Sequence, residues 1–175
     1  TLPPSADTCR KELRSIQDRL TELSDDVRHL AYQFHPSILD DLGLPVALQR
    51  LVDDCAIRST LEISLEVDVT PHMIPQAVST CLYRIAQECL ANVMKHAHAS
   101  RATVSLASTA DGITLTVQDD GIGFDTQNAV DNPRGLGLVS MAERVRLVHG
   151  TVTIDSIPRK GTRLSVHVPH AEVSV

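Results

Sequence analysis

Three polar residues with chemically useful side chains recur at helical spacing within residues 83–100. Glu88 and Asn92 are four residues apart, and Lys95 follows three residues later. Because each residue turns a helix by about 100°, the three side chains would project along nearly one line. A carboxylate can orient or deprotonate an attacking group, an amide oxygen can bind Mg²⁺, and an ammonium can neutralise phosphate oxygens. The trio therefore suits nucleotide chemistry, although a solvated helix flank could carry the same residue types.

An apolar stripe runs beside this polar line and predicts a long core helix over about 76–96. The polar side chains would then lie at the edge of the buried face, on the rim of a pocket. The stripe consists of Val78, Leu82, Ile85, Cys89 and Val93.

A second phrase places acidic residues and glycines at the end of a predicted strand. The alternating segment 112–118 is followed by Asp119 and Asp120, and then by Gly121 and Gly123. An aspartate at a strand end can accept a hydrogen bond from an adenine amino group. The glycines allow positive φ and a close approach of the backbone to a ligand. An ordinary Asp/Gly turn would have the same sequence.

Two later phrases could complete such a pocket. Gly135 and Gly137 precede a predicted helix at 138–149, where free backbone N–H groups form a natural phosphate seat. Arg134 beside them could reach phosphate. The last predicted strand begins at Thr162, which could bond to the aspartate or to a water under an adenine. A flexible helix entry and a plain hairpin are the structural alternatives.

The elements that would position these residues follow from periodicity and from Gly/Pro breakers. Residues 37–44 are expected to form a short bent connection, and 120–136 a long loop of the kind that is usually functional. The order of elements predicts an α/β two-layer sandwich, a mixed sheet with helices on one face. We predict helices over 45–58, 76–96 and 138–149, and strands over 61–69, 101–108, 112–118, 151–157 and 162–168.

Residues 10–34 carry a heptad pattern that is typical of a coiled coil or four-helix bundle, formed across a dimer. A long helix packed on its own domain is the alternative. We therefore divide the chain into a bundle helix with linker (1–45), a sandwich domain (46–170) and a tail (171–175). The seam consists of Leu13, Ile16, Leu20, Leu23, Val27, Leu30 and Phe34.

Composition excludes several classes of protein. With 42% hydrophobic and 22% charged residues the chain is an ordinary globular sequence, and a net charge of -6 argues against nucleic-acid binding. The four cysteines form no C-x-x-C pair, which excludes zinc-ribbon and thioredoxin classes, and Cys81 and Cys89 are expected in the core. Because no apolar run approaches the roughly 18 residues that cross a bilayer, we expect a cytoplasmic location without membrane contact. The chain starts with Thr1 and is expected to be a fragment, with room for a membrane segment upstream.

In order and spacing, these phrases resemble the ATP-binding domain shared by histidine kinases, Hsp90, gyrase B and MutL, the Bergerat fold of the GHKL superfamily. Within it, residues 28–169 are most similar to two-component sensor kinases of the nitrate- and desaturase-sensor type. RIAQECLANVMKHAHASRATVSL resembles the N box, QDDGIGFD the first glycine box and RGLGLVSMAERV the second. LAYQFHPSILDDLGLPVAL resembles the end of the dimerisation hairpin.

This resemblance implies a role for each candidate residue. Glu88 would assist phosphoryl transfer, Asn92 would hold Mg²⁺ with Glu88 as a second candidate ligand, and Asp119 would bind the adenine amino group. The cofactors would be ATP and Mg²⁺, residues 124–136 would form the ATP lid, and the partners would be a response regulator and a second copy joined through the upstream hairpin. The other nucleotide-binding positions would be Lys95, His96, Gly121, Gly123, Arg134, Gly135, Gly137, Leu138 and Thr162.

One part of the family's pattern is missing. The acceptor histidine of these kinases is normally followed by an acidic residue, and none of the eight histidines here is. We therefore expect the chain to bind ATP without phosphorylating itself. Three alternatives are an anti-sigma-type serine kinase, a non-catalytic nucleotide-binding or dimerising module, and an unrelated α/β binding protein. The heptad seam speaks against the first, and the intact Glu88, Asn92 and Asp119 speak against the second.

Overall fold

The structure is a computed structural model that describes residues 37–69, 74–125 and 136–170. The predicted helix over 10–34, the tail 171–175 and most of the predicted lid lie outside the described residues. No helix in the described ranges combines the length and hydropathy needed to cross a lipid bilayer.

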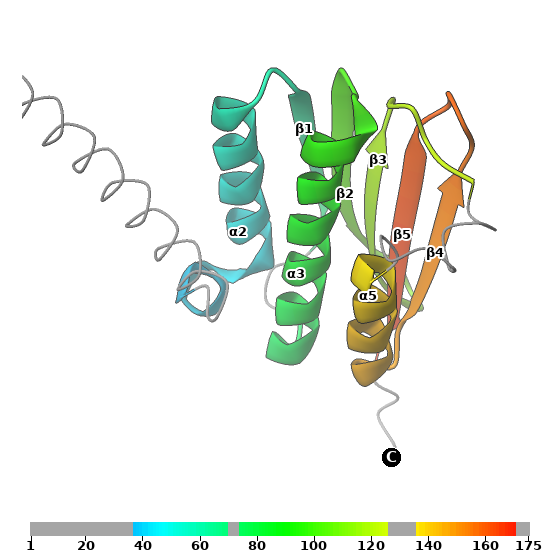
Figure 1. The fold of residues 1–175 in the computed structure, drawn as a ribbon. Coiled ribbons are helices and arrows are strands. Elements are labelled where there is room, and N and C mark those ends of the chain that lie inside the picture. Colours follow the sequence, from blue (N-terminus) through cyan, green and yellow to red (C-terminus); the bar gives the residue numbers. More distant parts are fainter. Residues whose placement is uncertain (1–36, 70–73, 126–135, 171–175) are drawn as a thin grey trace, which may run out of the picture. The chain divides into compact units, whose positions relative to one another are not determined.

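Five strands form one mixed sheet in the order β1-β2-β3-β5-β4 (Figure 1). The strands β1 and β2 run parallel, and every other neighbouring pair is antiparallel. Alternating apolar residues explain why these segments form strands, because a strand with one buried face needs an apolar side chain at every second position. The strands are β1 (Glu62–Asp68), β2 (Arg101–Ser108), β3 (Gly112–Asp119), β4 (Thr151–Ser156) and β5 (Thr162–Pro169).

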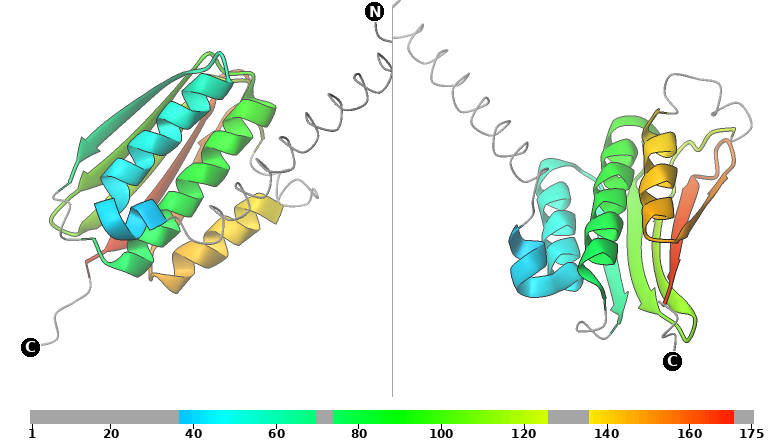
Figure 2. Two further views of the ribbon diagram at one scale, coloured as in Figure 1. Left: turned by 90° about the vertical axis from the view of Figure 1, so that its left-hand side faces the viewer. Right: turned by 90° about the horizontal axis from the view of Figure 1, so that it is seen from below.

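Three helices cover one face of this sheet, as the views in Figures 1 and 2 show. They are α2 (Ser37–Arg58), α3 (Gln76–Asn92), which continues into the π-helical turn η2 (Val93–Ala97), and α5 (Leu136–Leu147). The predicted two-layer α/β sandwich is therefore confirmed.

Aliphatic side chains fill the layer between helices and sheet. Leu48 from α2, Leu82 and Ile85 from α3, and Leu115 from β3 are fully buried. The predicted placement of Cys81 and Cys89 in the core is confirmed, since they are 7% and 6% exposed. The opposite face of the sheet carries hydroxyl groups that pair across strands.

Two predicted boundaries were wrong. Residues 37–44 are helical apart from a break at Gly43 (φ 79°, ψ 172°), and the helix resumes at once. Pro45 fits there because the first turn after a break needs no N–H from that residue. Leu39 and Leu44 are both buried, so this first part of α2 belongs to the core.

The helix predicted over 76–96 is also not regular to its end. After Asn92 the backbone widens into the π turn of η2, which ends at Ala97. Single π turns are rare and are found frequently at functional sites.

Candidate nucleotide-binding site

A cavity of about 720 Å³ lies at one end of the sandwich, lined by residues of α3, η2, β3, β4, β5 and α5. Its volume is within the range of roughly 300–1,000 Å³ typical of small-molecule sites. Gly121 is adjacent to the lining, and Arg134 and Gly135 lie outside the described residues. The predicted residues that line the cavity are Glu88, Asn92, Lys95, His96, Asp119, Gly123, Gly137, Leu138 and Thr162.

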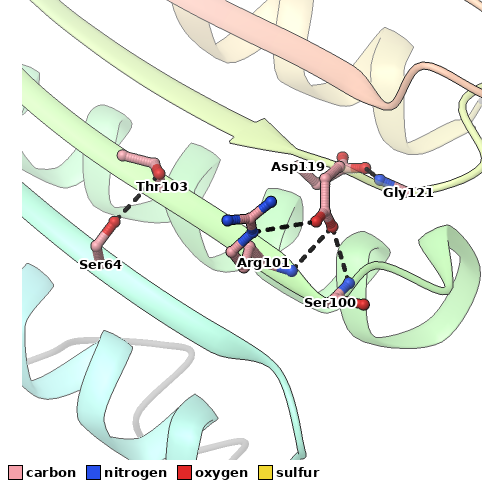
Figure 3. A network of polar contacts seen from close by, with 7 residues as sticks. Ser64, Ser100, Arg101, Thr103, Asp119 and Gly121 are labelled. Carbon is pink, nitrogen blue, oxygen red and sulfur yellow. Dashed lines mark hydrogen bonds and ion pairs between the residues drawn. The ribbon is translucent and has the colours of Figure 1, made fainter.

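Asp119 lies at the last position of β3, directly opposite Thr162 of β5. Its side chain is 8% exposed, and its Oδ1 accepts a hydrogen bond of 2.8 Å from the Gly121 N–H (Figure 3). Burial raises the pKa of the Asp119 carboxyl above its ordinary value of 3.8, although N–H groups of Gly121 and Thr162 oppose the rise. A buried acceptor thus faces the cavity in a fixed orientation.

The alternation of the strands explains which neighbours share the cavity with Asp119. Val117 is two residues earlier on β3, and Leu164 is two residues after Thr162 on β5, so all four side chains point to one face. Both Val117 and Leu164 are buried and line the cavity. They give the carboxylate apolar walls of the kind that a planar base requires.

Three glycines allow the backbone to close around Asp119. A Cβ on Gly161 (φ 81°) would lie 2.0 Å from the Asp119 carbonyl oxygen, and one on Gly123 (φ 57°) would lie 2.1 Å from the Ile157 carbonyl oxygen. A Cβ on Gly121 would lie 2.3 Å from the Ala97 carbonyl oxygen. The close approach that we predicted for Gly121 is therefore to another part of the chain.

The π turn is joined to the loop after β3 by a backbone hydrogen bond. The Ile122 N–H donates to the Ala97 carbonyl at 2.8 Å, and the Arg159 N–H of the β4–β5 turn donates to the Ile122 carbonyl at 2.6 Å. Three segments distant in sequence are thus joined to one another, and two of them, η2 and the loop after β3, line the cavity.

The hydroxyl groups of Ser156 and Thr162 connect the loop after β3 to strands β4 and β5. Ser156 Oγ accepts a hydrogen bond of 2.8 Å from the Phe124 N–H and lies 2.9 Å from Thr162 Oγ1. The Thr162 hydroxyl is thus engaged with Ser156, while the backbone N–H of Thr162 helps to lower the pKa of the Asp119 carboxyl.

Asp120, the neighbour of Asp119, lies outside the cavity lining. Its Oδ1 accepts hydrogen bonds of 2.8 Å from the N–H groups of Ser100 and Arg101, and its Oδ2 lies 3.4 Å from Arg101 Nε (Figure 3). These hydrogen bonds lower the pKa of the Asp120 carboxyl. Asp120 therefore fastens the start of β2 to the end of β3.

The other end of the cavity is more open. Glu88 and Lys95 are exposed and Asn92 is half-buried, all along the α3–η2 edge that the spacing predicted. Within the described residues, no hydrogen bond or ion pair engages these three side chains. Gly137, at the start of α5, lies close enough that an added Cβ would be 2.9 Å from Glu88 Oε1. The start of α5 and the Glu88 carboxylate are thus immediate neighbours at this end.

Sequence reasoning missed several lining residues, including Cys89 and His98. We assigned Cys89 to the core alone, yet it also contributes to the cavity wall beside Glu88. Burial raises the pKa of its thiol to about 12, so it is a neutral wall group at physiological pH. Its position directly after Glu88 was the signal that could have found it.

The chain belongs to the family of histidine kinase-, DNA gyrase B- and HSP90-like ATPases, which matches residues 77–172. More narrowly, the relatives that it resembles are sensor histidine kinases. The oxygen sensor histidine kinase NreB of Staphylococcus carnosus is 35% identical over 158 residues, which cover 89% of this chain and 45% of NreB. The sensor histidine kinase MctS of Rhizobium johnstonii is 36% identical over 145 residues, which cover 82% of this chain and 31% of MctS. The chain spans less than half the length of these relatives.

Solved structures agree with this assignment. The ATP binding domain of PrrB from Mycobacterium tuberculosis matches with a TM-score of 0.60 at 26% identity, over 72% of this chain and 93% of that domain. The histidine kinase domain of a blue-light activated kinase from Erythrobacter litoralis EL346 matches with a TM-score of 0.59 at 21% identity, over 73% of this chain and 61% of that one, and supports the fold alone. The resemblance to sensor histidine kinases inferred from the motif order is confirmed.

Proposed function

We propose that this chain binds ATP with Mg²⁺ and donates the γ-phosphoryl group to a histidine on a dimerisation helix, for relay to a response regulator. One observation carries the proposal. A single cavity brings a buried aspartate between apolar walls together with an exposed Glu–Asn–Lys edge. A base and a polyphosphate need these two environments, at opposite ends of one site.

Each end has a role in this proposal. The Asp119 carboxylate accepts a hydrogen bond from the adenine amino group, and Val117 and Leu164, cross-strand neighbours on one face of the sheet, contact one side of the base. At the open end, Lys95 and His96 approach the phosphates, together with the N–H groups at the start of α5. Glu88 orients the acceptor imidazole or removes its proton as the phosphoryl group is transferred.

The residues at the open end also fit Mg²⁺. Asn92 supplies a neutral oxygen and Glu88 an anionic one, one helical turn apart, with no hydrogen bond or ion pair to another described residue. Mg²⁺ is usually held by one or two protein oxygens with phosphates and waters, so no larger acidic cluster is required. When bound, Mg²⁺ would neutralise charge on the phosphate oxygens.

The first test is thermal melting with MgADP, comparing wild type with Asp119→Ala. A ligand that binds only the folded state adds roughly 2.7 kcal/mol at a hundredfold excess over its dissociation constant. We expect a ligand-induced rise in melting temperature for wild type and none for Asp119→Ala. Asp120→Ala is the matched control, because its carboxylate lies outside the cavity, and it should keep the rise.

The absence of any rise in folded wild type, at millimolar MgADP, would reject the proposal. A rise that survives in Asp119→Ala would reject the adenine role of that residue. For the transfer step, the chain is mixed with a histidine-bearing dimerisation hairpin and ATP. We expect phosphohistidine on the hairpin and none on this chain alone.

A further inference from the structure

The π turn of η2 ends at His98, which has a left-handed backbone (φ 48°, ψ 36°). Its side chain is exposed and lines the nucleotide cavity. The family resemblance includes this histidine in the N-box phrase but implies a role only for its neighbours Lys95 and His96.

A glycine would satisfy the backbone at this position better than histidine does. Side chains with a Cβ are disfavoured in the left-handed region, and helices that end in this conformation usually place glycine there. Backbone strain of this kind clusters at functional sites, where the side chain is needed. The end of η2 requires a left-handed residue, which explains the backbone conformation of His98. It does not explain why the residue is a histidine and not a glycine.

His149 shows what such a position looks like without a ligand site. It also has a positive φ (56°), it is also exposed, and it lies just after the end of α5. His149 is absent from the cavity lining. The two histidines thus share residue type, backbone conformation and a position after a helix, and they differ in their access to the cavity.

The neighbours of His98 indicate which part of a ligand it meets. The carbonyl of Ala97, the preceding residue, accepts the hydrogen bond from Ile122, three residues after Asp119. Gly121 packs against the same Ala97 carbonyl. His98 therefore directly follows the residue through which η2 is joined to the loop after Asp119.

We propose that His98 contacts the nucleoside part of the bound nucleotide and is a specificity-determining residue of this site, held at a cost in backbone strain. The inference rests on the proposed ATP-binding function. An imidazole can stack on a base or hydrogen bond to a ribose hydroxyl, and either contact leaves the phosphates untouched.

The test compares His98→Gly with His149→Gly in melting temperature and in affinity for MgADP by calorimetry. Both changes relieve the left-handed backbone, so both should raise the melting temperature of the ligand-free protein by about 2–4 °C. Only His98→Gly should also lower the affinity for MgADP, by about tenfold. A purely structural histidine would give the stability gain without the loss of affinity.

A second variant and a second ligand make the result decisive. His98→Asn tolerates the left-handed region and removes the ring, so it should keep wild-type stability and still weaken MgADP. The loss of affinity should be equal for AMP, which shares only the nucleoside and the first phosphate. Unchanged MgADP affinity in both variants would overturn the inference, and so would a loss confined to MgADP. If wild type itself binds no MgADP, the proposed function is rejected. This outcome is distinct from rejection of the role of His98, which requires that wild type binds MgADP and that the variants bind it equally well.

Discussion

The two ends of the cavity are built in opposite ways. Around Asp119, the backbone is fixed by hydrogen bonds from Gly121 and Ile122 and by glycines whose Cβ positions are occupied by carbonyl oxygens. Around Glu88, Asn92 and Lys95, the described residues offer no hydrogen bond or ion pair to the side chains. We call these regions the closed end and the open end.

The difference separates two tasks. In the proposed function the base is a rigid planar group, so a site that is fixed in advance binds it without an ordering cost. A phosphoryl group that must leave needs charged side chains whose partners arrive with the substrate and depart with the product. Changes at the closed end should therefore alter folding and binding together, whereas changes at the open end should alter the reaction and spare the fold.

The largest expected effect is on phosphoryl transfer, from Glu88→Gln at the open end. The amide keeps the shape and removes the base, so single-turnover transfer from ATP to a histidine-bearing dimerisation hairpin should slow by about 10²–10⁴-fold. Because Glu88 is exposed, the free energy of unfolding should stay within about 0.5 kcal/mol of wild type. Glu143→Gln, an exposed glutamate of α5 outside the cavity lining, should leave the transfer rate unchanged. If Glu88→Gln lowered the free energy of unfolding well beyond this range, the division into two ends would be contradicted.

The next effect is on stability and compares two glycines. Gly161→Ala places a Cβ 2.0 Å from a backbone oxygen at a φ of 81°, which no side-chain rotation can relieve. We expect a loss of roughly 3 kcal/mol in urea unfolding, together with loss of MgADP binding.

Gly137→Ala is the matched change at the open end. Its nearest neighbour is Glu88 Oε1 at 2.9 Å, the mobile tip of an exposed side chain. Its unfolding free energy should stay within about 1 kcal/mol of wild type, because alanine is also the better helix former. The displaced carboxylate should slow transfer. Equal destabilisation by the two substitutions would show that the open end is as rigid as the closed one.

The smallest effect distinguishes the two adjacent aspartates by pH. Burial raises the pKa of Asp119 above 3.8, so its charge opposes folding above the raised pKa, and this cost disappears as the pH falls through it. Asp119→Asn should therefore be more stable than wild type at pH 7, and the difference between their free energies of unfolding should become smaller toward pH 4.

The charge of the Asp120 carboxylate affects stability in the opposite direction and favours folding. Hydrogen bonds lower its pKa, so its contribution is complete above its unfolded value of 3.8 and is lost only below it. Asp120→Asn should be less stable than wild type, with a gap that stays constant from pH 7 to pH 4. Urea unfolding of the three proteins across this range checks both statements. Parallel pH profiles for the two variants would refute the separate roles of the carboxylates.

The sequence was sufficient to predict the layers and much of the cavity lining. Period-two and period-3.6 patterns report burial directly, so they placed the strands and put Glu88, Asn92 and Lys95 on one edge.

What the sequence could not supply depends on contacts between distant segments. The π turn after Asn92 and the break at Gly43 are tertiary adjustments that propensity does not encode. The separate roles of Asp119 and Asp120 arise because β3 turns one carboxylate toward the helices and the other toward Ser100 and Arg101. His98 was missed because no sequence pattern distinguishes it from the other exposed histidines until the cavity lining is known.

The position of β5 in the sheet has a consequence for biosynthesis. This strand is the last described element in sequence, yet it lies in the interior of the sheet between β3 and β4, and among the described strands β4 pairs with β5 alone. A nascent chain that has not yet released residues 162–169 therefore lacks the strand that completes the sheet and the wall opposite Asp119. The nucleotide site forms only after β5 leaves the ribosome, so ATP cannot assist the folding of the earlier segments during translation.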